Sequence, residues 1–179
     1  MTAKTETRKT GADPWFDVGQ GSHLHIGHFL TFQLIRLANA AKSHEKRRYL
    51  ADSDLSVPEW LLLAMTARFE PVRFSELVAN SSIDKGQASR TLHGMIKRGY
   101  IAAESPTPGA RKAGGRTVVP LILTVTPKGG LLHKAVLPVA QRNQARLLQK
   151  LTRDERSTLY SVLRKLYSAI GAPELSDED

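Results

Sequence analysis

The chain has 179 residues, which is long enough to bury a hydrophobic core without cross-links and fits one domain with accessory helices. It contains no Cys, so disulfides and thiolate metal sites are excluded, as expected for a protein of a reducing compartment. The formal net charge is +9, and leaving out the four acids of residues 174–179 raises it to +13 for residues 1–173. Such a basic body favours a polyanionic partner, most often nucleic acid.

Both ends of the chain are polar. Residues 1–21 are predicted to be a flexible tail, and they do not form a signal peptide because no apolar stretch follows their basic residues. Residues 172–179 are predicted to be an acidic tail. The longest dense apolar run, residues 60–65, is far shorter than the roughly 18 residues that a membrane span needs.

The first predicted helix covers residues 24–49. Ile26, Leu30, Leu34 and Leu37 recur at steps of three and four, and further apolar residues widen this stripe. We therefore expect the helix to be buried on more than one side.

Residues 56–59 then combine three signals for the start of a helix. Ser56 can accept a hydrogen bond from the amide three residues on, Glu59 can reach back to close a capping box, and Pro58 suits the first turn. The helix that follows is apolar all round over residues 60–65, which predicts a place in the core or between layers.

A short helix is expected over residues 74–80, followed by a longer one over residues 84–98. Asp84 is the predicted N-cap of the longer helix, with Gln87 placed to close the box, and Gly99 is its predicted stop.

Residues 100–104 and 117–125 are predicted strands, joined by a loop rich in Gly, Pro and basic residues. Because Pro120 cannot donate to a sheet ladder, the second strand should lie at an edge or bulge there. The two strands form a hairpin with a long basic tip.

Two more helices complete the chain. Thr126 and Pro127 start a helix expected to reach about residue 151, in which Pro138 predicts a kink. Thr152 and Glu155 form another capping box, and the last helix carries an apolar stripe that includes Leu163. The fold class is therefore mainly α with a small β-hairpin.

A pair of short helices followed by a hairpin is the order of a winged helix-turn-helix. In the helix at 84–98, Ala88, Leu92 and Met95 share one face and should point to the core. The opposite face is basic, polar and low in bulk, as a helix in the major groove needs, since Arg pairs with guanine and Gln with adenine. The expected DNA contacts are Lys85 and Ser89 to phosphates, and Gly86, Gln87, Arg90, His93 and Lys97 on the outward face.

The tip of the hairpin supplies the second group of candidate DNA contacts. Arg111, Lys112 and Arg116 lie in a flexible basic loop, and Arg is favoured in a narrow, negative minor groove.

The ordered set of motifs resembles the MarR family of bacterial transcriptional regulators over residues 29–170. The matching stretches are LSVPEW at residues 55–60, FSELV at 74–78, IDKGQASRTL at 83–92, KRGYI at 97–101 and LTVTPKG at 123–129. Many family members have an Asp-x-Arg element in the wing. Residues 106–117 contain no Asp, which leaves open whether Arg111 or Arg116 enters the minor groove.

The resemblance implies a cytoplasmic bacterial homodimer bound to a palindromic operator on double-stranded DNA. Residues 22–54 and 126–171 would form the dimerisation helices, and residues 55–125 the winged helix-turn-helix. It also implies a repressor that leaves DNA when a small aromatic or phenolic ligand binds. We name His25, His28, Phe32 and Trp60 as candidate ligand contacts.

Two other interpretations stay open, and a third is weighed against them. The His-rich segment at residues 23–28 could make the protein a zinc-responsive regulator, although we assign no metal ligand or cofactor. The second interpretation is a DNA-binding architectural protein without base preference. An enzyme is the third and is not expected, because no nucleophile elbow, phosphate loop or metal-ligand motif is found and no catalytic residue is assigned.

Overall fold

The computed structural model describes residues 14–16, 18–19, 24–48, 50, 52–81, 83–105 and 121–171. The chain divides into two compact units, residues 1–44 and 45–179, and each is described by itself. No helix within the described ranges is long and apolar enough to cross a bilayer.

The first unit contains a short 3-10 turn, η1 (Ile26–His28), and most of helix α1 (Leu30–Arg48). The prediction of one continuous helix from residue 24 is therefore wrong at the start of that helix. Phe29 has an extended backbone (φ −62°, ψ 128°), and this conformation separates the turn from α1. The expectation that α1 is buried on more than one side also fails in the single chain, where Ile35 and Leu37 are 59% and 67% exposed.

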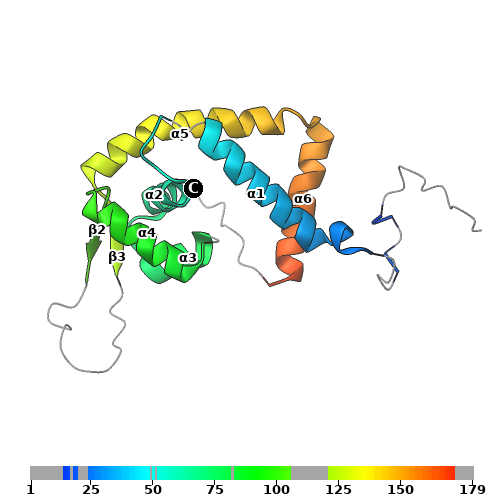
Figure 1. Ribbon diagram of the computed structural model, residues 1–179, viewed down its shortest axis with the longest axis horizontal. Coiled ribbons are helices and arrows are strands. Elements are labelled where there is room, and N and C mark those ends of the chain that lie inside the picture. Colours follow the sequence, from blue (N-terminus) through cyan, green and yellow to red (C-terminus); the bar gives the residue numbers. More distant parts are fainter. Residues whose placement is uncertain are drawn as a thin grey trace, which may run out of the picture. The chain divides into compact units, whose positions relative to one another are not determined.

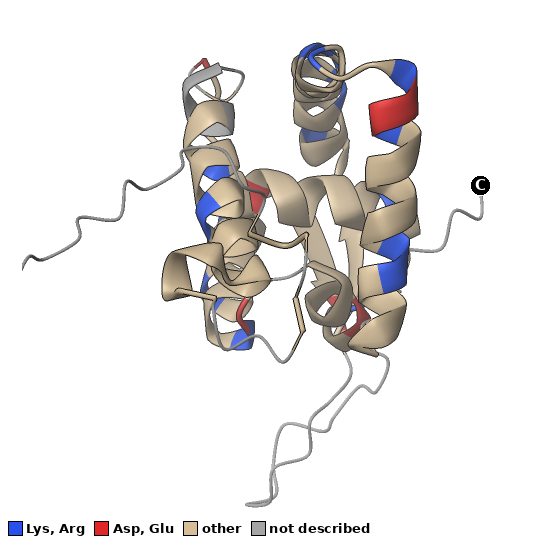
Figure 2. Cartoon of the chain, turned by 90° about the vertical axis from the view of Figure 1, so that its right-hand side faces the viewer, with Lys and Arg blue, Asp and Glu red and all other residues tan. Residues whose placement is uncertain are grey.

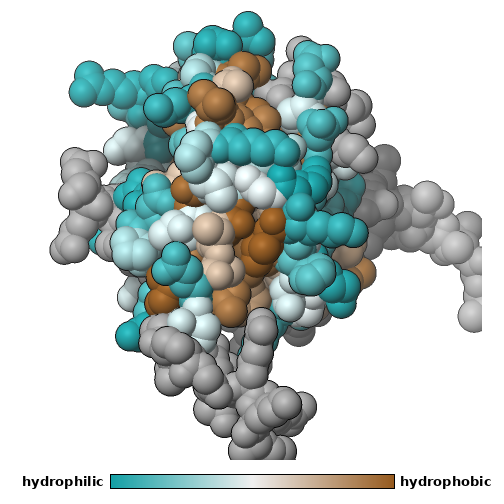
Figure 3. Space-filling model, turned by 90° about the vertical axis from the view of Figure 1, so that its left-hand side faces the viewer, coloured by the Kyte–Doolittle hydropathy of each residue, from teal (hydrophilic) through white to brown (hydrophobic). Residues whose placement is uncertain are grey.

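The second unit holds the other elements in the expected order (Figure 1). They are α2 (Val57–Phe69), β1 (Val72–Arg73), α3 (Phe74–Ser81), α4 (Lys85–Lys97), β2 (Ile101–Glu104), β3 (Ile122–Val125), α5 (Pro127–Leu148) and α6 (Arg153–Ala169). Figure 3 looks onto the side of this unit that carries the sheet, where hydrophobic side chains gather between hydrophilic ones.

The sheet has three antiparallel strands in the order β1-β3-β2, one more than the expected hairpin. Val72 of β1 pairs with Leu123, and Ile101 of β2 pairs with Val125 on the other side of β3. A strand of two residues is too short to show the alternation that predicts strands, so β1 was missed. The expected strand start at residue 117 lies outside the described residues.

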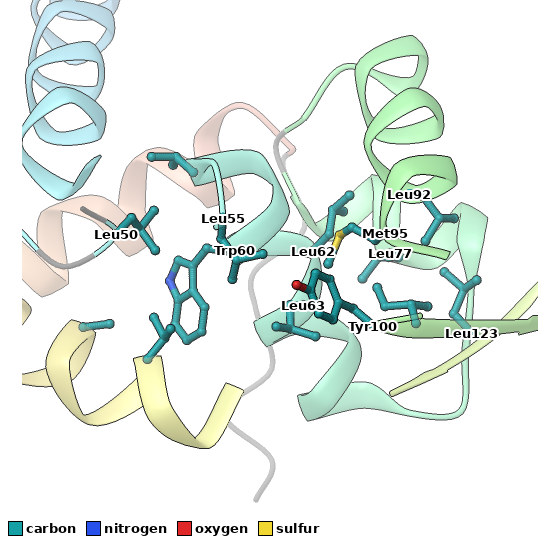
Figure 4. Close-up of a cluster of buried hydrophobic side chains, with 14 of the residues drawn as sticks. Leu50, Leu55, Trp60, Leu62, Leu63, Leu77, Leu92, Met95, Tyr100 and Leu123 are labelled. Atoms are coloured by element: carbon teal, nitrogen blue, oxygen red, sulfur yellow. The ribbon is translucent and has the colours of Figure 1, made fainter. Parts of the chain in front are cut away.

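Helix α2 lies in the core, as its apolar composition predicts. Trp60, Leu62, Leu63 and Thr66 are at most 5% exposed. Figure 4 shows Leu62 and Leu63 among side chains from α3, α4 and the sheet, including Leu77, Met95 and Leu123. Burial of each large aliphatic side chain contributes about 1.5–3 kcal/mol, so these contacts hold α4 and the sheet on α2.

The last two helices begin where the sequence predicts. Thr126 accepts a hydrogen bond from the Gly129 amide at 3.0 Å, and Thr152 accepts one from the Glu155 amide at 3.3 Å. Helix α5 ends at Leu148, three residues before the expected end, because the chain turns there before the Thr152 cap. Pro138 lies inside α5, and the kink expected there stays a prediction.

Candidate nucleic-acid interface

Helix α4 is fixed at both ends and along one face. The Asp84 carboxylate accepts a hydrogen bond from the Gln87 amide at 3.0 Å, which satisfies one of the free amides of the first turn. Gly99 has a φ of +72°, a conformation that costs glycine little, and it turns the chain from α4 toward β2. The expected core residues Ala88, Leu92 and Met95 are at most 4% exposed.

The opposite face of α4 is open to solvent. The seven α4 residues predicted to contact DNA are all exposed: Lys85, Gly86, Gln87, Ser89, Arg90, His93 and Lys97. Helix α4 contains no acid, so this face combines three cations with amide, hydroxyl and imidazole groups. Chemically, such a face can neutralise phosphates and offer donors to base edges.

Gly86 lies close to the side chains of Asp84 and Arg90. A Cβ atom built on Gly86 would lie 3.5 Å from Nη1 of Arg90 and 3.1 Å from Oδ1 of Asp84. The guanidinium of Arg90 therefore extends toward the N-terminal end of α4, over the space that the missing side chain leaves.

The other predicted DNA contacts, Arg111, Lys112 and Arg116, lie outside the described residues. The strands on either side of them are described, and Glu104 at the end of β2 is paired with Ile122 at the start of β3. The three cations therefore lie in the chain between two paired strand ends.

The predicted ligand contacts fall into two groups. His25 and His28 lie together in the first unit, with ring centroids 6.0 Å apart in an edge-on arrangement, and Phe32 has the Arg36 guanidinium 5.8 Å from its ring. Trp60 belongs to the second unit, where it is buried. Among the described residues, no cluster of three or more His, Asp or Glu could hold a metal ion.

Trp60 has a neighbour that the sequence analysis missed. The ring of His133 in α5 stacks on it, with centroids 5.6 Å apart and planes 20° from parallel. Burial lowers the pKa of His133 below 6.5, and the nearby Glu70 carboxylate opposes this shift. No sequence signal joins residues this far apart, so only the fold identifies the pair.

Basic residues outnumber acidic ones along several helices, as Figure 2 shows by the blue segments. Helix α5 carries four Lys or Arg residues and no acid. The charge imbalance of the sequence thus persists in the described part of the chain, where it gives a surface suited to a polyanion.

A short helix, a turn, an exposed basic helix and a three-stranded sheet together define a winged helix-turn-helix protein. The sequence model described as "MarR family" matches residues 53–113. A curated relative, the HTH-type transcriptional regulator SAV2265 of Staphylococcus aureus, is 25% identical over 114 residues, which are 63% of this chain and 73% of that protein. Residues 53–113 of the chain thus match the MarR family, and the curated proteins that the chain resembles are transcriptional regulators rather than enzymes.

Solved structures share the fold. A MarR/EmrR family regulator from Acinetobacter sp. ADP1 superposes with a TM-score of 0.70 at 19% identity, covering 83% of this chain and 99% of that one. A mutant MarR from E. coli complexed with operator DNA gives 0.60 at 23% identity, covering 75% and 91%. BpsR of Bordetella bronchiseptica, whose DNA binding is regulated by 6-hydroxynicotinic acid, gives 0.65 at 19% identity, covering 81% and 98%.

Proposed function

We propose that the protein is a sequence-specific, dimeric transcriptional repressor that reads a palindromic operator with α4 and leaves it when a small aromatic ligand binds. The observation that carries this proposal is the outward face of α4, which is exposed, basic and without acids while its other face is buried. The complex of a MarR mutant with operator DNA supports the DNA-binding part by similarity of fold.

In this proposal Arg90 and Gln87 read bases in the major groove, where each can make two hydrogen bonds to one base. His93 and Lys97 extend the same face toward the C-terminal end of α4. Gly86 lets the axis of α4 approach the base edges.

Two further sets of residues fix the position on the duplex. Lys85 and Ser89 bind phosphates beside the amino-terminal end of α4, whose free amides also favour an anion. Arg111, Lys112 and Arg116 form the wing contacts, with one of the two arginines in the minor groove.

The apolar surfaces left exposed in the single chain support a homodimer. Helix α6 has no buried residue, and its Leu159, Leu163 and Tyr167 are 43%, 36% and 47% exposed. Exposed apolar side chains of this size along a whole helix favour association, and we propose that a second copy covers those of α6 and α1. The dimerisation segments are then residues 22–54 and 126–171, which flank the DNA-binding residues 55–125.

For the effector we propose a planar aromatic acid or phenol. The regulation of BpsR by 6-hydroxynicotinic acid supports this class by similarity of fold. His25, His28 and Phe32 of the first unit offer exposed or half-buried rings to such a molecule. Trp60 stays a separate candidate ligand contact within the second unit, where it is buried. Screening aromatic acids for release of bound DNA tests this part, and a screen in which zinc alone releases DNA would contradict it.

Arg90→Ala tests the base-reading role, because Arg90 is proposed to make two bonds to one guanine. We expect a loss of roughly 1–3 kcal/mol per site and a relaxed base preference in a selection from random duplexes. Arg142→Ala is the matched control, since it removes one exposed cation from α5, away from the reading face. Equal weakening by Arg90→Ala on every duplex would make Arg90 a phosphate contact instead.

A further inference from the structure

The carboxyl-terminal end of α4 is connected to two other helices by charged side chains. The Arg98 guanidinium donates from Nη1 to the backbone oxygen of Asp54 at 3.0 Å and from Nη2 to the carboxylate of Glu59. The pair is partly shielded from water, with 34% of the Arg98 side chain and 19% of the Glu59 side chain exposed. Arg98 therefore points to the start of α2 and not to the outward face of α4.

Glu59 uses both of its carboxylate oxygens. Oε2 accepts hydrogen bonds from the Ser56 amide at 2.7 Å and the Ser56 hydroxyl at 2.8 Å, which caps α2. Oε1 accepts a hydrogen bond from the Arg98 guanidinium. One carboxylate thus fixes the first turn of α2 and the end of α4 together.

Helix α5 also contacts this end of α4. The ammonium of Lys128 donates to the Arg98 carbonyl at 2.9 Å and lies 4.8 Å from the centre of the Tyr100 ring. The Arg98 guanidinium lies 4.9 Å from the centre of that ring. Two cations therefore lie beside one aromatic ring, and the Glu59 carboxylate supplies a negative charge that offsets that of Arg98.

We propose that Glu59 and Arg98 are positioning residues for DNA recognition: they set the orientation of α4 relative to α2 and α5, and they touch no DNA. This inference rests on the proposed function, in which α4 reads bases. Base readout needs side chains held within about 0.5 Å, and the core contacts of α4 are apolar and fix orientation less strictly than directed bonds do.

A distance measurement without DNA tests whether Glu59 and Arg98 set the orientation of α4. The chain has no Cys, so His93→Cys and Leu131→Cys, two exposed sites on α4 and α5, accept spin labels without other changes. We expect Arg98→Lys and Glu59→Gln to broaden or shift the distance distribution between the labels. Glu76→Gln is the control, because it removes the exposed 3.6 Å ion pair with Arg73 and keeps an oxygen for the hydrogen bond from the Arg73 amide. It should leave the distribution unchanged.

A binding measurement then tests the effect on recognition, at a temperature where circular dichroism shows every variant folded. Arg98→Lys and Glu59→Gln should lower the ratio of specific to non-specific affinity roughly tenfold, the size of one lost base contact, with non-specific binding unchanged. The double variant should lose no more than either single variant, because the two residues act through each other.

The outcomes separate the positioning role from the proposed function. Unchanged label distances in Arg98→Lys and Glu59→Gln would overturn the positioning role, and so would an equal fall of specific and non-specific affinity. A wild-type protein that prefers no duplex would contradict the proposed function, and the label distances would still decide whether Glu59 and Arg98 orient α4.

Discussion

Gly129→Ala tests how closely α5 approaches the end of α4. A Cβ atom at Gly129 would lie 2.0 Å from the carbonyl oxygen of Tyr100 and 2.9 Å from its carbonyl carbon, far inside an ordinary contact of about 3.5 Å. Both atoms belong to the backbone, so the start of α5 must move away by about 1.5 Å to restore an ordinary contact. That movement would break the 3.2 Å hydrogen bond from the Thr126 amide to the Tyr100 carbonyl.

The expected loss follows from these changes. Overpacking costs about 1–3 kcal/mol and a lost hydrogen bond about 1 kcal/mol. The better helix propensity of Ala offsets about 1 kcal/mol, so we expect the free energy of unfolding to fall by roughly 1–3 kcal/mol.

Urea unfolding followed by circular dichroism measures this loss, at one protein concentration for all variants because association affects stability. Gly130→Ala is the matched control: it is the next residue of the same helix, and its added Cβ would meet nothing within 4 Å. It should be neutral or stabilising by up to about 1 kcal/mol. If Gly129→Ala is as stable as Gly130→Ala, the close approach of α5 to Tyr100 is wrong.

Three further predictions concern a cap, a titrating group and an interface. Asp84→Ala should cost about 1 kcal/mol in urea unfolding, since it removes the 3.0 Å bond to the Gln87 amide, and a wild-type value would contradict the cap. The lowered pKa of His133 means that the unfolded chain takes up a proton before the folded chain does as the pH falls. Its contribution to stability should therefore be complete above about pH 6.5 and be lost below it. His133→Phe keeps an aromatic ring on Trp60 and should abolish this loss of stability at low pH, which thermal unfolding at a series of pH values measures. If the wild type and His133→Phe lose stability in parallel as the pH falls, His133 is not the group responsible. Leu163→Asp should leave a monomer or an unfolded chain in light scattering, and a well-folded dimer would exclude α6 from the interface.

Local signals explain why so much of the fold was predictable. The caps Asp84, Thr126 and Thr152 act within three residues of their partners, so the sequence alone indicates where α4, α5 and α6 begin. The buried face of α4 was predictable for a related reason, because a spacing of three and four residues can be recognised within one helix.

Contacts between distant residues were not predictable. Arg98 and Glu59 are 39 positions apart, and Trp60 meets His133 only because α5 packs on α2. Arg98 and Glu59 both belong to motifs that the sequence analysis identified, but nothing in these motifs indicates that the Glu59 carboxylate contacts both α2 and α4. Strand β1 was missed for lack of length, and its pairing with β3 depends on where the fold brings Val72.

The most direct test of DNA reading by α4 is binding to the duplex upstream of the gene for this protein, titrated against salt, with a scrambled duplex of the same composition beside it. We expect tight binding to the upstream duplex alone and a steep fall of affinity with salt, because several phosphates are neutralised by Lys and Arg. No binding to either duplex at low salt would contradict the account, and the exposed face of α4 would then be an ordinary solvated surface.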